Sequence, residues 1–291
     1  MTRLAPPSTG SWRIEDGRIN GGAVVAKEGA ALVVSGGRAA TLDSVTLNSD
    51  VTVEPGGRMV ALNGLTLNGT LTLDERSGAY TALEFSETQT LSGTGEIVLP
   101  AFNHSGQVRP LSGTLTIGPD ITIHGRAGTV GHETLPLVNH GRIIADTPLG
   151  GFGRGILVVG AELDNRGTVG ATSEGLMFLR NLKNTGSVAV STKGSVVIDG
   201  NWTNGGAMMI DDAWLGLGGT FTVGALGTLQ RTGGTVVLFG VLDNAGTTLS
   251  LDASTGSWRI EDGRINGGSV AAKDGASLAV SGGRAATLDG V

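Results

Sequence analysis

The stretch LDNRGTV at residues 163–169 returns as LKNTGSV at 182–188, as WTNGGAM at 202–208 and as LDNAGTT at 242–248. The asparagines of these four units are 19, 20 and 40 residues apart, so the period is close to 20 residues with one degenerate member near Gly224. A unit of this length that recurs along a chain is typical of an architecture in which neighbouring units stack to complete a core.

Short runs of alternating apolar and polar residues separate these turns. Residues 65–73 read LTLNGTLTL, and residues 195–198 read SVVI. Alternation with period two, punctuated by Gly and Asn, indicates short strands joined by turns. The sequence therefore predicts an all-β, single-domain parallel β-solenoid, or β-helix, with coils of about 20 residues. An antiparallel sandwich would explain the alternation but not the period.

The solenoid carries several detailed expectations. Asn tolerates a left-handed turn, and stacked turns would place Asn165, Asn184 and Asn204 in a column whose amides bond along the stack. About 14 coils spaced by about 4.8 Å would form a rod of roughly 65–70 Å. The segment from Asp74 to Val108 lacks the repeat, and we expect its coils to be irregular.

Composition excludes several protein classes. The chain has 51 Gly among 291 residues, 16% charged and 4% aromatic residues, which excludes coiled coils, while 8 Pro exclude collagen. No Cys is present, so there is neither a disulfide framework nor a thiolate site. A net charge of −6 argues against a nucleic-acid partner. No apolar run approaches about 18 residues, so we expect no membrane insertion of this segment.

A much longer repeat encloses the short one. Residues 9–43 and 255–289 differ at only five of 35 positions and are offset by 246 residues. We expect one long repeat plus the start of the next, cut from a longer array. The predicted organisation is a lead or linker over residues 1–8 and a solenoid over residues 9–291. Compatible coils at the two ends also predict end-to-end self-association.

The units resemble those of filamentous haemagglutinin and autotransporter passengers, which are large bacterial surface proteins. Other segments carry the same resemblance: TLDSVTLN at 41–48, LTLNGT at 65–70, QTLSGTG at 89–95 and LQRTGG at 229–234. This resemblance implies a right-handed coil, export and an extended stalk at the cell surface or outside the cell. The expected function is a non-catalytic structural or adhesive stalk without a cofactor or a metal. A β-helix polysaccharide lyase or hydrolase stays open as the alternative.

Asp211 and Asp212 are the best candidates for a catalytic pair, because neighbouring carboxylates can act as acid and base or hold a cation. Consecutive strand residues point to opposite faces, however, which favours a corner after Ile210. In polygalacturonase-like hydrolases an Asp pair precedes a His-containing turn and Arg-x-Lys. Here the sequence NHGRI at residues 139–143 comes before the pair and lacks the Lys.

His124, His132 and His140 are spaced by eight residues, and Glu133 follows the second. Imidazole and carboxylate groups are zinc ligands, but eight residues within a coil of about 20 should turn each His to a different face. We therefore expect solvated surface histidines rather than a metal site.

The remaining motifs favour structural roles. The GGFGRG run at 150–155 lacks both the P-loop Lys and the Asp of calcium-binding nonapeptides, which favours a flexible loop. Thr-x-Thr triplets begin at Thr70, Thr114 and Thr220 without a common register, so a flat ice-binding array is not expected. Trp12 and Trp258 are equivalent in the long repeat, and we expect both to pack inward. Glycosylation acceptor motifs, relevant only in a eukaryotic secretory host, begin at Asn68, Asn103 and Asn201.

Overall fold

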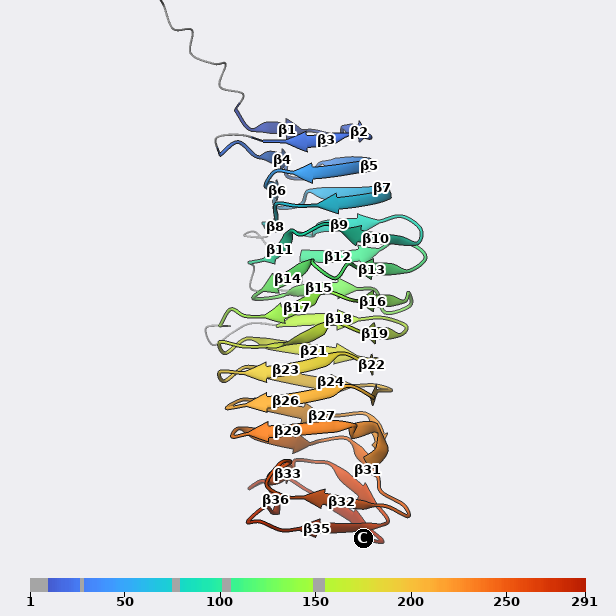
Figure 1. Ribbon diagram of the computed structural model, residues 1–291, viewed down its shortest axis with the longest axis vertical. Helices are drawn as coiled ribbons and strands as arrows, with labels where there is room; N and C mark the ends of the chain where they lie inside the picture. Colours follow the sequence, from blue (N-terminus) through green and yellow to red (C-terminus); the bar gives the residue numbers. More distant parts are fainter. Residues whose placement is uncertain (1–9, 27–28, 75–78, 101–105, 149–154) are drawn as a thin grey trace, which may run out of the picture.

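The chain forms a parallel β-solenoid of about 12 turns with about 21 residues in each (Figure 1). The computed structural model describes residues 10–26, 29–74, 79–100, 106–148 and 155–291. Strands make up 57% of the described residues, and the helical structure of these ranges is one 3-10 helix, η1 (Val223–Leu226). Every ladder between named strands is parallel, which confirms the predicted fold class and excludes the antiparallel sandwich.

Each turn passes through three faces in the same order, here called faces A, B and C. Face A is built from β1 (Trp12–Ile14), β4 (Leu32–Val34), β6 (Val51–Val53), β8 (Thr70–Leu73), β11 (Glu96–Leu99), β14 (Thr122–Gly125), β17 (Arg142–Ala145), β20 (Thr168–Ala171), β23 (Ser187–Ser191), β26 (Ala207–Asp211), β29 (Thr228–Thr232), β32 (Thr248–Leu251) and β35 (Ser269–Ala272).

Faces B and C share two long strands, β5 (Ala39–Asn48) and β7 (Arg58–Leu67), which bend around the edge between them. Face B adds β2 (Arg18–Asn20), β9 (Thr81–Phe85), β12 (Gly106–Pro110), β15 (Gly128–Gly131), β18 (Ile156–Val159), β21 (Leu176–Arg180), β24 (Ser195–Asp199), β27 (Trp214–Leu217), β30 (Thr235–Leu238), β33 (Trp258–Ile260) and β36 (Leu278–Val280). Face C adds β3 (Ala23–Val25), β10 (Gln89–Ser92), β13 (Leu115–Ile117), β16 (Leu137–Asn139), β19 (Leu163–Asn165), β22 (Leu182–Asn184), β25 (Thr203–Asn204), β28 (Thr220–Thr222), β31 (Val241–Asp243), β34 (Arg264–Asn266) and β37 (Thr287–Asp289).

Alternation along each strand builds the core. In β23, Val188 and Val190 are buried, while Ala189 between them points outward. Val188 also lies between Val169 and Met208 of the adjacent turns. Equivalent apolar positions repeat in this way on each face, so one apolar cluster runs from Leu32 through the interior to Ile265.

The predicted asparagine column is confirmed, and it lies inside the solenoid. Nδ2 of Asn165 donates to Oδ1 of Asn184 at 2.6 Å, and Nδ2 of Asn184 donates to Oδ1 of Asn204 at 2.7 Å. Asn139 extends the column by one turn. At the other end of the column, Nδ2 of Asn204 donates to the carbonyl of Leu226 in η1. The 3-10 helix therefore occupies the place of the next asparagine, where the unit of the sequence repeat is degenerate.

Coil length varies more than the sequence period suggests. Successive strands of face A are offset by 19–21 residues, except for three offsets of 26 residues, of which Thr70 to Glu96 and Glu96 to Thr122 are two. The expectation of irregular coils from Asp74 to Val108 is confirmed for coil length, since two of the three 26-residue offsets fall there, although β9 to β12 keep parallel register with their neighbours. These longer coils also reduce the predicted 14 coils to about 12.

The two copies of the long repeat fold alike on different faces. Trp12 pairs with Leu32 in β4 as Trp258 pairs with Leu278 in β36. However, β1 is the first strand of face A, whereas β33 is the twelfth strand of face B. The eleven strands before it on face B are β2, β5, β7, β9, β12, β15, β18, β21, β24, β27 and β30. The 246-residue repeat thus advances the chain by eleven turns and one face.

Candidate functional site

A buried carboxylate on face B is the most strongly hydrogen-bonded acidic group in the described part of the chain. Glu84 of β9 is 0% exposed, and β7 and β12 pair with β9 on either side. Arg58 donates to Oε2 at 2.9 and 2.5 Å, and Arg109 donates to Oε1 at 3.2 and 2.8 Å. The Tyr80 hydroxyl donates to Oε1 at 2.8 Å, and the Arg109 guanidinium lies 5.2 Å from the Tyr80 ring centre.

These contacts decide the ionisation of the cluster. Burial works to raise the pKa of Glu84, but the hydrogen bonds from Arg109, Arg58 and Tyr80 outweigh burial and lower it. Burial, together with the hydrogen bond to Glu84, raises the pKa of Tyr80. Both Glu84 oxygens are occupied and shielded from solvent, so this carboxylate has no free lone pair to act as a base on a substrate. The arrangement instead fastens three consecutive turns together.

The sequence did not point to this cluster. Arg58 and Arg109 lie 26 and 25 residues from Glu84, which differs from the apparent 20-residue period. Their alignment follows only from the longer coils around β9. The one available signal was the single Tyr of the sequence, Tyr80, which lies in the segment without the repeat.

The acidic pair occupies a corner. Asp211 is the last residue of β26, and Asp212 has a left-handed φ of 44°, so the chain turns where the sequence analysis expected it to turn. Both side chains are exposed. Asp211 lies between Ser191 and Thr232 on the adjacent turns, neither of which is an acid or a base. This corner therefore lacks the convergent polar groups that acid–base chemistry requires.

The three histidines belong to three different elements. His124 lies on β14 of face A, His132 follows β15, and His140 follows β16. Nδ1 of His124 lies 2.8 Å from Asp146, and its Nε2 lies 3.4 Å from Glu96. Among the described residues no three His, Cys, Asp or Glu side chains come together as metal ligands would.

The other motifs are dispersed. The Thr-x-Thr triplets lie on face A at β8 and on face C at β13 and β28, so they share no register. Asn68 donates to Asn48 at 2.7 Å, and Asn201 is exposed in a turn. Asn103, most of the run at 150–155 and the lead at 1–8 lie outside the described residues.

Hollows on the flanks of the rod offer little chemistry. One, of about 380 Å³, is lined by Glu162, Lys183, Thr203 and Trp202. Trp202 is buried there, stacks 4.5 Å from Phe221 and donates from Nε1 to the carbonyl of Gly218, so it presents no platform for a sugar ring. A second, of about 370 Å³, lies where β29 and β32 of face A do not pair, and Leu229, Leu249 and Trp258 line it.

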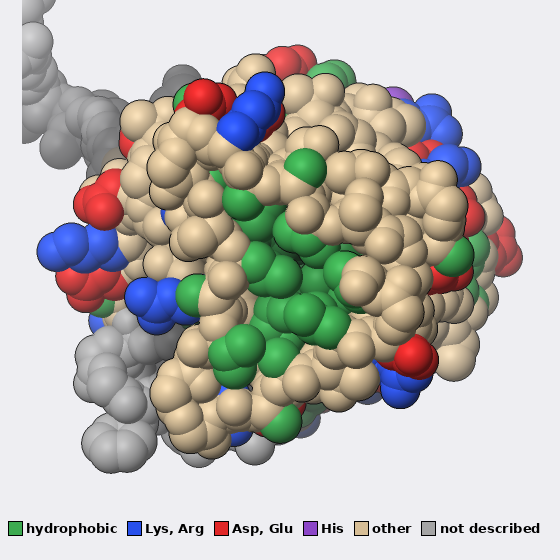
Figure 2. All heavy atoms as spheres, turned by 90° about the horizontal axis from the view of Figure 1, so that it is seen from below, with side chains coloured by type: hydrophobic (Ala, Val, Ile, Leu, Met, Phe, Trp, Pro, Cys, Tyr) green, Lys and Arg blue, Asp and Glu red, His purple; other side chains and the backbone are tan. Residues whose placement is uncertain are grey.

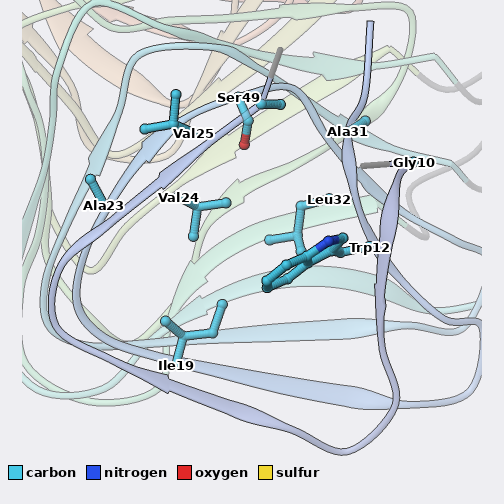
Figure 3. Close-up of a pocket in the computed structure, with 10 residues that line it drawn as sticks. Gly10, Trp12, Ile19, Ala23, Val24, Val25, Ala31, Leu32 and Ser49 are labelled. Carbon is cyan, nitrogen blue, oxygen red and sulfur yellow. The ribbon is translucent and has the colours of Figure 1, made fainter. Parts of the chain in front are cut away.

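Another hollow lies at the N-terminal end of the solenoid (Figure 3). It has a volume of about 470 Å³, and Trp12, Ile19, Val24, Val25 and Leu32 line it. Inward packing was expected for both equivalent tryptophans, and it is confirmed for Trp258, which is 0% exposed. It is wrong for Trp12, which is 69% exposed because the described structure has no coil above β1.

The opposite end is apolar as well. Figure 2 views the molecule from the end that carries β35, β36 and β37, and apolar side chains gather in its middle. Val280 and Leu288 are 57% and 55% exposed there, and Leu278 lies beside them, partly buried. Both ends of the described solenoid thus carry exposed apolar side chains, and charged side chains surround the apolar centre of the end in Figure 2.

No helix in the described ranges has the length and apolar character needed to cross a membrane. Comparison of the chain with protein-family models, with curated proteins and with solved structures finds no match. The resemblance to filamentous-haemagglutinin and autotransporter repeats therefore rests on the repeat units and on the solenoid that they build.

Proposed function

We propose that this chain is a non-catalytic structural and adhesive stalk module of a large repetitive bacterial surface protein, exported to the cell surface or beyond. The observation that carries the proposal is that the two copies of the long repeat form the same strand pairings and the same side-chain hydrogen bonds. Arg18 bonds Asn20 and Asp43 as Arg264 bonds Asn266 and Asp289.

The corner contacts repeat as well. Arg38 bonds Asp16 at 2.7 Å, as Arg284 bonds Asp262 at 2.9 Å. A coil of this sequence thus forms the same local contacts in the first described turn and below eleven other turns. Modules of this kind can be added in line without a change of fold, which is what a stalk of adjustable length requires.

The flanks support a mechanical rather than a chemical role. Charges one or two turns apart neutralise one another: Arg13 contacts Glu54 at 2.6 Å across two turns, and Arg58 and Arg109 bond Glu84 on the turn between them. Such pairs add little to stability when exposed, but they keep the surface polar and the turns in register. Adhesion would then depend on the shape and repetition of the flanks.

The proposal is tested by length and by location. A chain in which residues 9–254 are present twice should scatter X-rays as a rod longer by about eleven turns of about 4.8 Å each, compared with the 291-residue chain. In the source bacterium, antibodies against the chain should label intact cells. A two-module chain that is no longer than one module, labelling only after lysis, or turnover of uronate-containing polysaccharides by the purified chain would each contradict the proposal.

A further inference from the structure

The two ends of the solenoid expose apolar surface where each flank is polar. At one end Trp12, Ile19 and Val24 surround an open hollow, and at the other Val280 and Leu288 face solvent. Within the described ranges β1, β36 and β37 each pair with a single strand, and natural β proteins usually cover such edges. The internal repeat shows what covers such an end.

The coil of residues 258–266 is the second copy of the coil of residues 12–20, and it is covered. Above it lie β30 and β31, with Val236 over Trp258 and Leu242 over Ile265. Both Trp258 and Ile265 are fully buried as a result. The surface that receives the WRI and RIN strands is therefore known: it consists of the sequences VVL at 236–238 and VLD at 241–243.

The exposed end of the same chain presents nearly the same two strands. There β36 reads LAV at 278–280 and β37 reads TLD at 287–289, on faces B and C, as β30 and β31 do. The inward-facing positions are aliphatic in both places. Leu278 and Val280 are equivalent to Val236 and Leu238, and Leu288 is equivalent to Leu242. On faces B and C the end of one molecule thus reproduces the surface that covers Trp258 and Ile265, while no strand there takes the place of β32 on face A.

We propose that a second copy of this chain docks head-to-tail on this end, with its β1 against β36 and its β2 against β37. The register is that of the internal coil, so Trp12 of the second copy faces Leu278 and Ile19 faces Leu288. Because β1 then continues face B rather than face A, each added copy is turned by one face. This inference concerns the ends alone and does not depend on where the protein works.

Charge supports this orientation. In the second copy, Arg18 on the outer side of β2 bonds Asp43 of the same molecule, one turn further along the chain. Docking would place the opposite edge of β2, and with it Arg18, close to Asp289 of the first copy. Asp289 is exposed and is bonded by Arg264 from above. Docking would therefore bring a second guanidinium near this carboxylate; in the internal coil Asp243 holds the equivalent place opposite Asn266, and there Arg264 bonds Asp289 on the other side.

The turn of one face has a consequence for any surface feature. The Glu84 cluster lies on one face of one copy, and the next copy would present it on the following face. Three docked copies would present every flank feature in three directions. The same rotation holds for copies joined within one chain, because β33 lies one face ahead of β1.

Two end variants and their mixture test the orientation. Trp12→Asp and Val280→Asp each place a charge in one apolar end, which should weaken association there by at least about 100-fold. In sedimentation equilibrium the unaltered chain should form assemblies that grow with concentration, while each variant alone should be monomeric. A 1:1 mixture should form dimers and nothing longer, since each variant keeps one intact end. Met209→Asp, on an exposed flank position, is the control and should assemble like the unaltered chain.

Cross-linking tests the register without disturbing the core. The chain has no Cys, so Arg13→Cys and Ala279→Cys molecules, mixed and oxidised, should form a disulfide between outward positions of paired strands. Arg18→Cys should cross-link with Thr287→Cys in the same way, whereas Arg13→Cys with Thr287→Cys should not. An unaltered chain that stays monomeric at millimolar concentration, dimers of Val280→Asp alone, or equal yields from all three Cys pairs would overturn the proposal.

Discussion

Nδ2 of Asn165 donates a hydrogen bond of 2.6 Å to Oδ1 of Asn184, one turn further along the solenoid. The same nitrogen bonds the carbonyls of Gly167 and Ser187, so one buried amide fixes both its own turn and the next one. Four asparagines in line make the column continuous from Asn139 to Asn204. An interior member therefore supports two neighbours, and an end member supports one.

Replacing Asn184 by Ala should destabilise the fold more than replacing Asn139. Asn184→Ala removes the oxygen that accepts from Asn165 and the amide group that donates to Asn204. We expect the free energy of unfolding to fall by about 2–4 kcal/mol. Asn139 has an Oδ1 without a partner already, so Asn139→Ala should cost about 1–2 kcal/mol. Urea unfolding at constant pH measures both, and equal losses at the two positions would contradict the account of the column.

Glu84→Gln should destabilise the chain and flatten its acid profile. The pKa of Glu84 is lowered below its ordinary value of 4.5, so its stabilising effect is complete above about pH 4.5 and is lost as the pH falls through the lowered pKa. At neutral pH the variant should lose about 3 kcal/mol, because two arginines keep their charge beside a neutral amide. Below the lowered pKa the two proteins should approach each other in stability.

Urea unfolding between pH 2 and 7 measures this difference. Glu162→Gln is the matched control, since Glu162 is exposed and its nearest cation, Lys183, lies 3.8 Å away. It should change stability by less than about 0.5 kcal/mol at any pH in this range. A constant difference between Glu84→Gln and the unaltered chain across the range would show that the carboxylate does not titrate as described.

The contrast between the Asn column and the Glu84 cluster shows what sequence can predict. Asn165, Asn184 and Asn204 lie 19 and 20 residues apart, so their spacing equals the coil length and their stacking follows from the period alone. Arg58, Glu84 and Arg109 meet only because the strands of face B are offset by 24 and 25 residues here, and that length depends on segments without a repeat. Burial at the ends is also invisible to sequence, since Trp12 and Trp258 have nearly identical neighbours along the chain but different coils above them.

The two equivalent tryptophans should respond differently to the same substitution. Trp258→Ala removes a fully buried ring, and it should cost about 3–5 kcal/mol and expose β33 to β37 to hydrogen exchange. Trp12→Ala removes a mostly exposed ring and should cost less than about 1 kcal/mol. Acrylamide should quench the Trp12 fluorescence far more than that of Trp258 in dilute solution. Similar exchange patterns in the two variants would contradict the difference in burial.

Gly170→Ala should separate two turns of face A, because a methyl group at this position would meet the carbonyl oxygen of Ala189 on the next turn. Gly170 lies within β20 between flanking core residues, so the strand cannot move outward without disturbing Val169 and Ala171. We expect a loss of about 1–3 kcal/mol from this overpacking, measured by urea unfolding. Gly205→Ala is the control, since its nearest neighbour would be a carbonyl oxygen at 3.7 Å and its surroundings are exposed. That variant should change stability by less than about 1 kcal/mol. If both variants were equally stable, the turns of face A would have to be further apart at Gly170 than the parallel ladder from β17 through β20 to β23 allows.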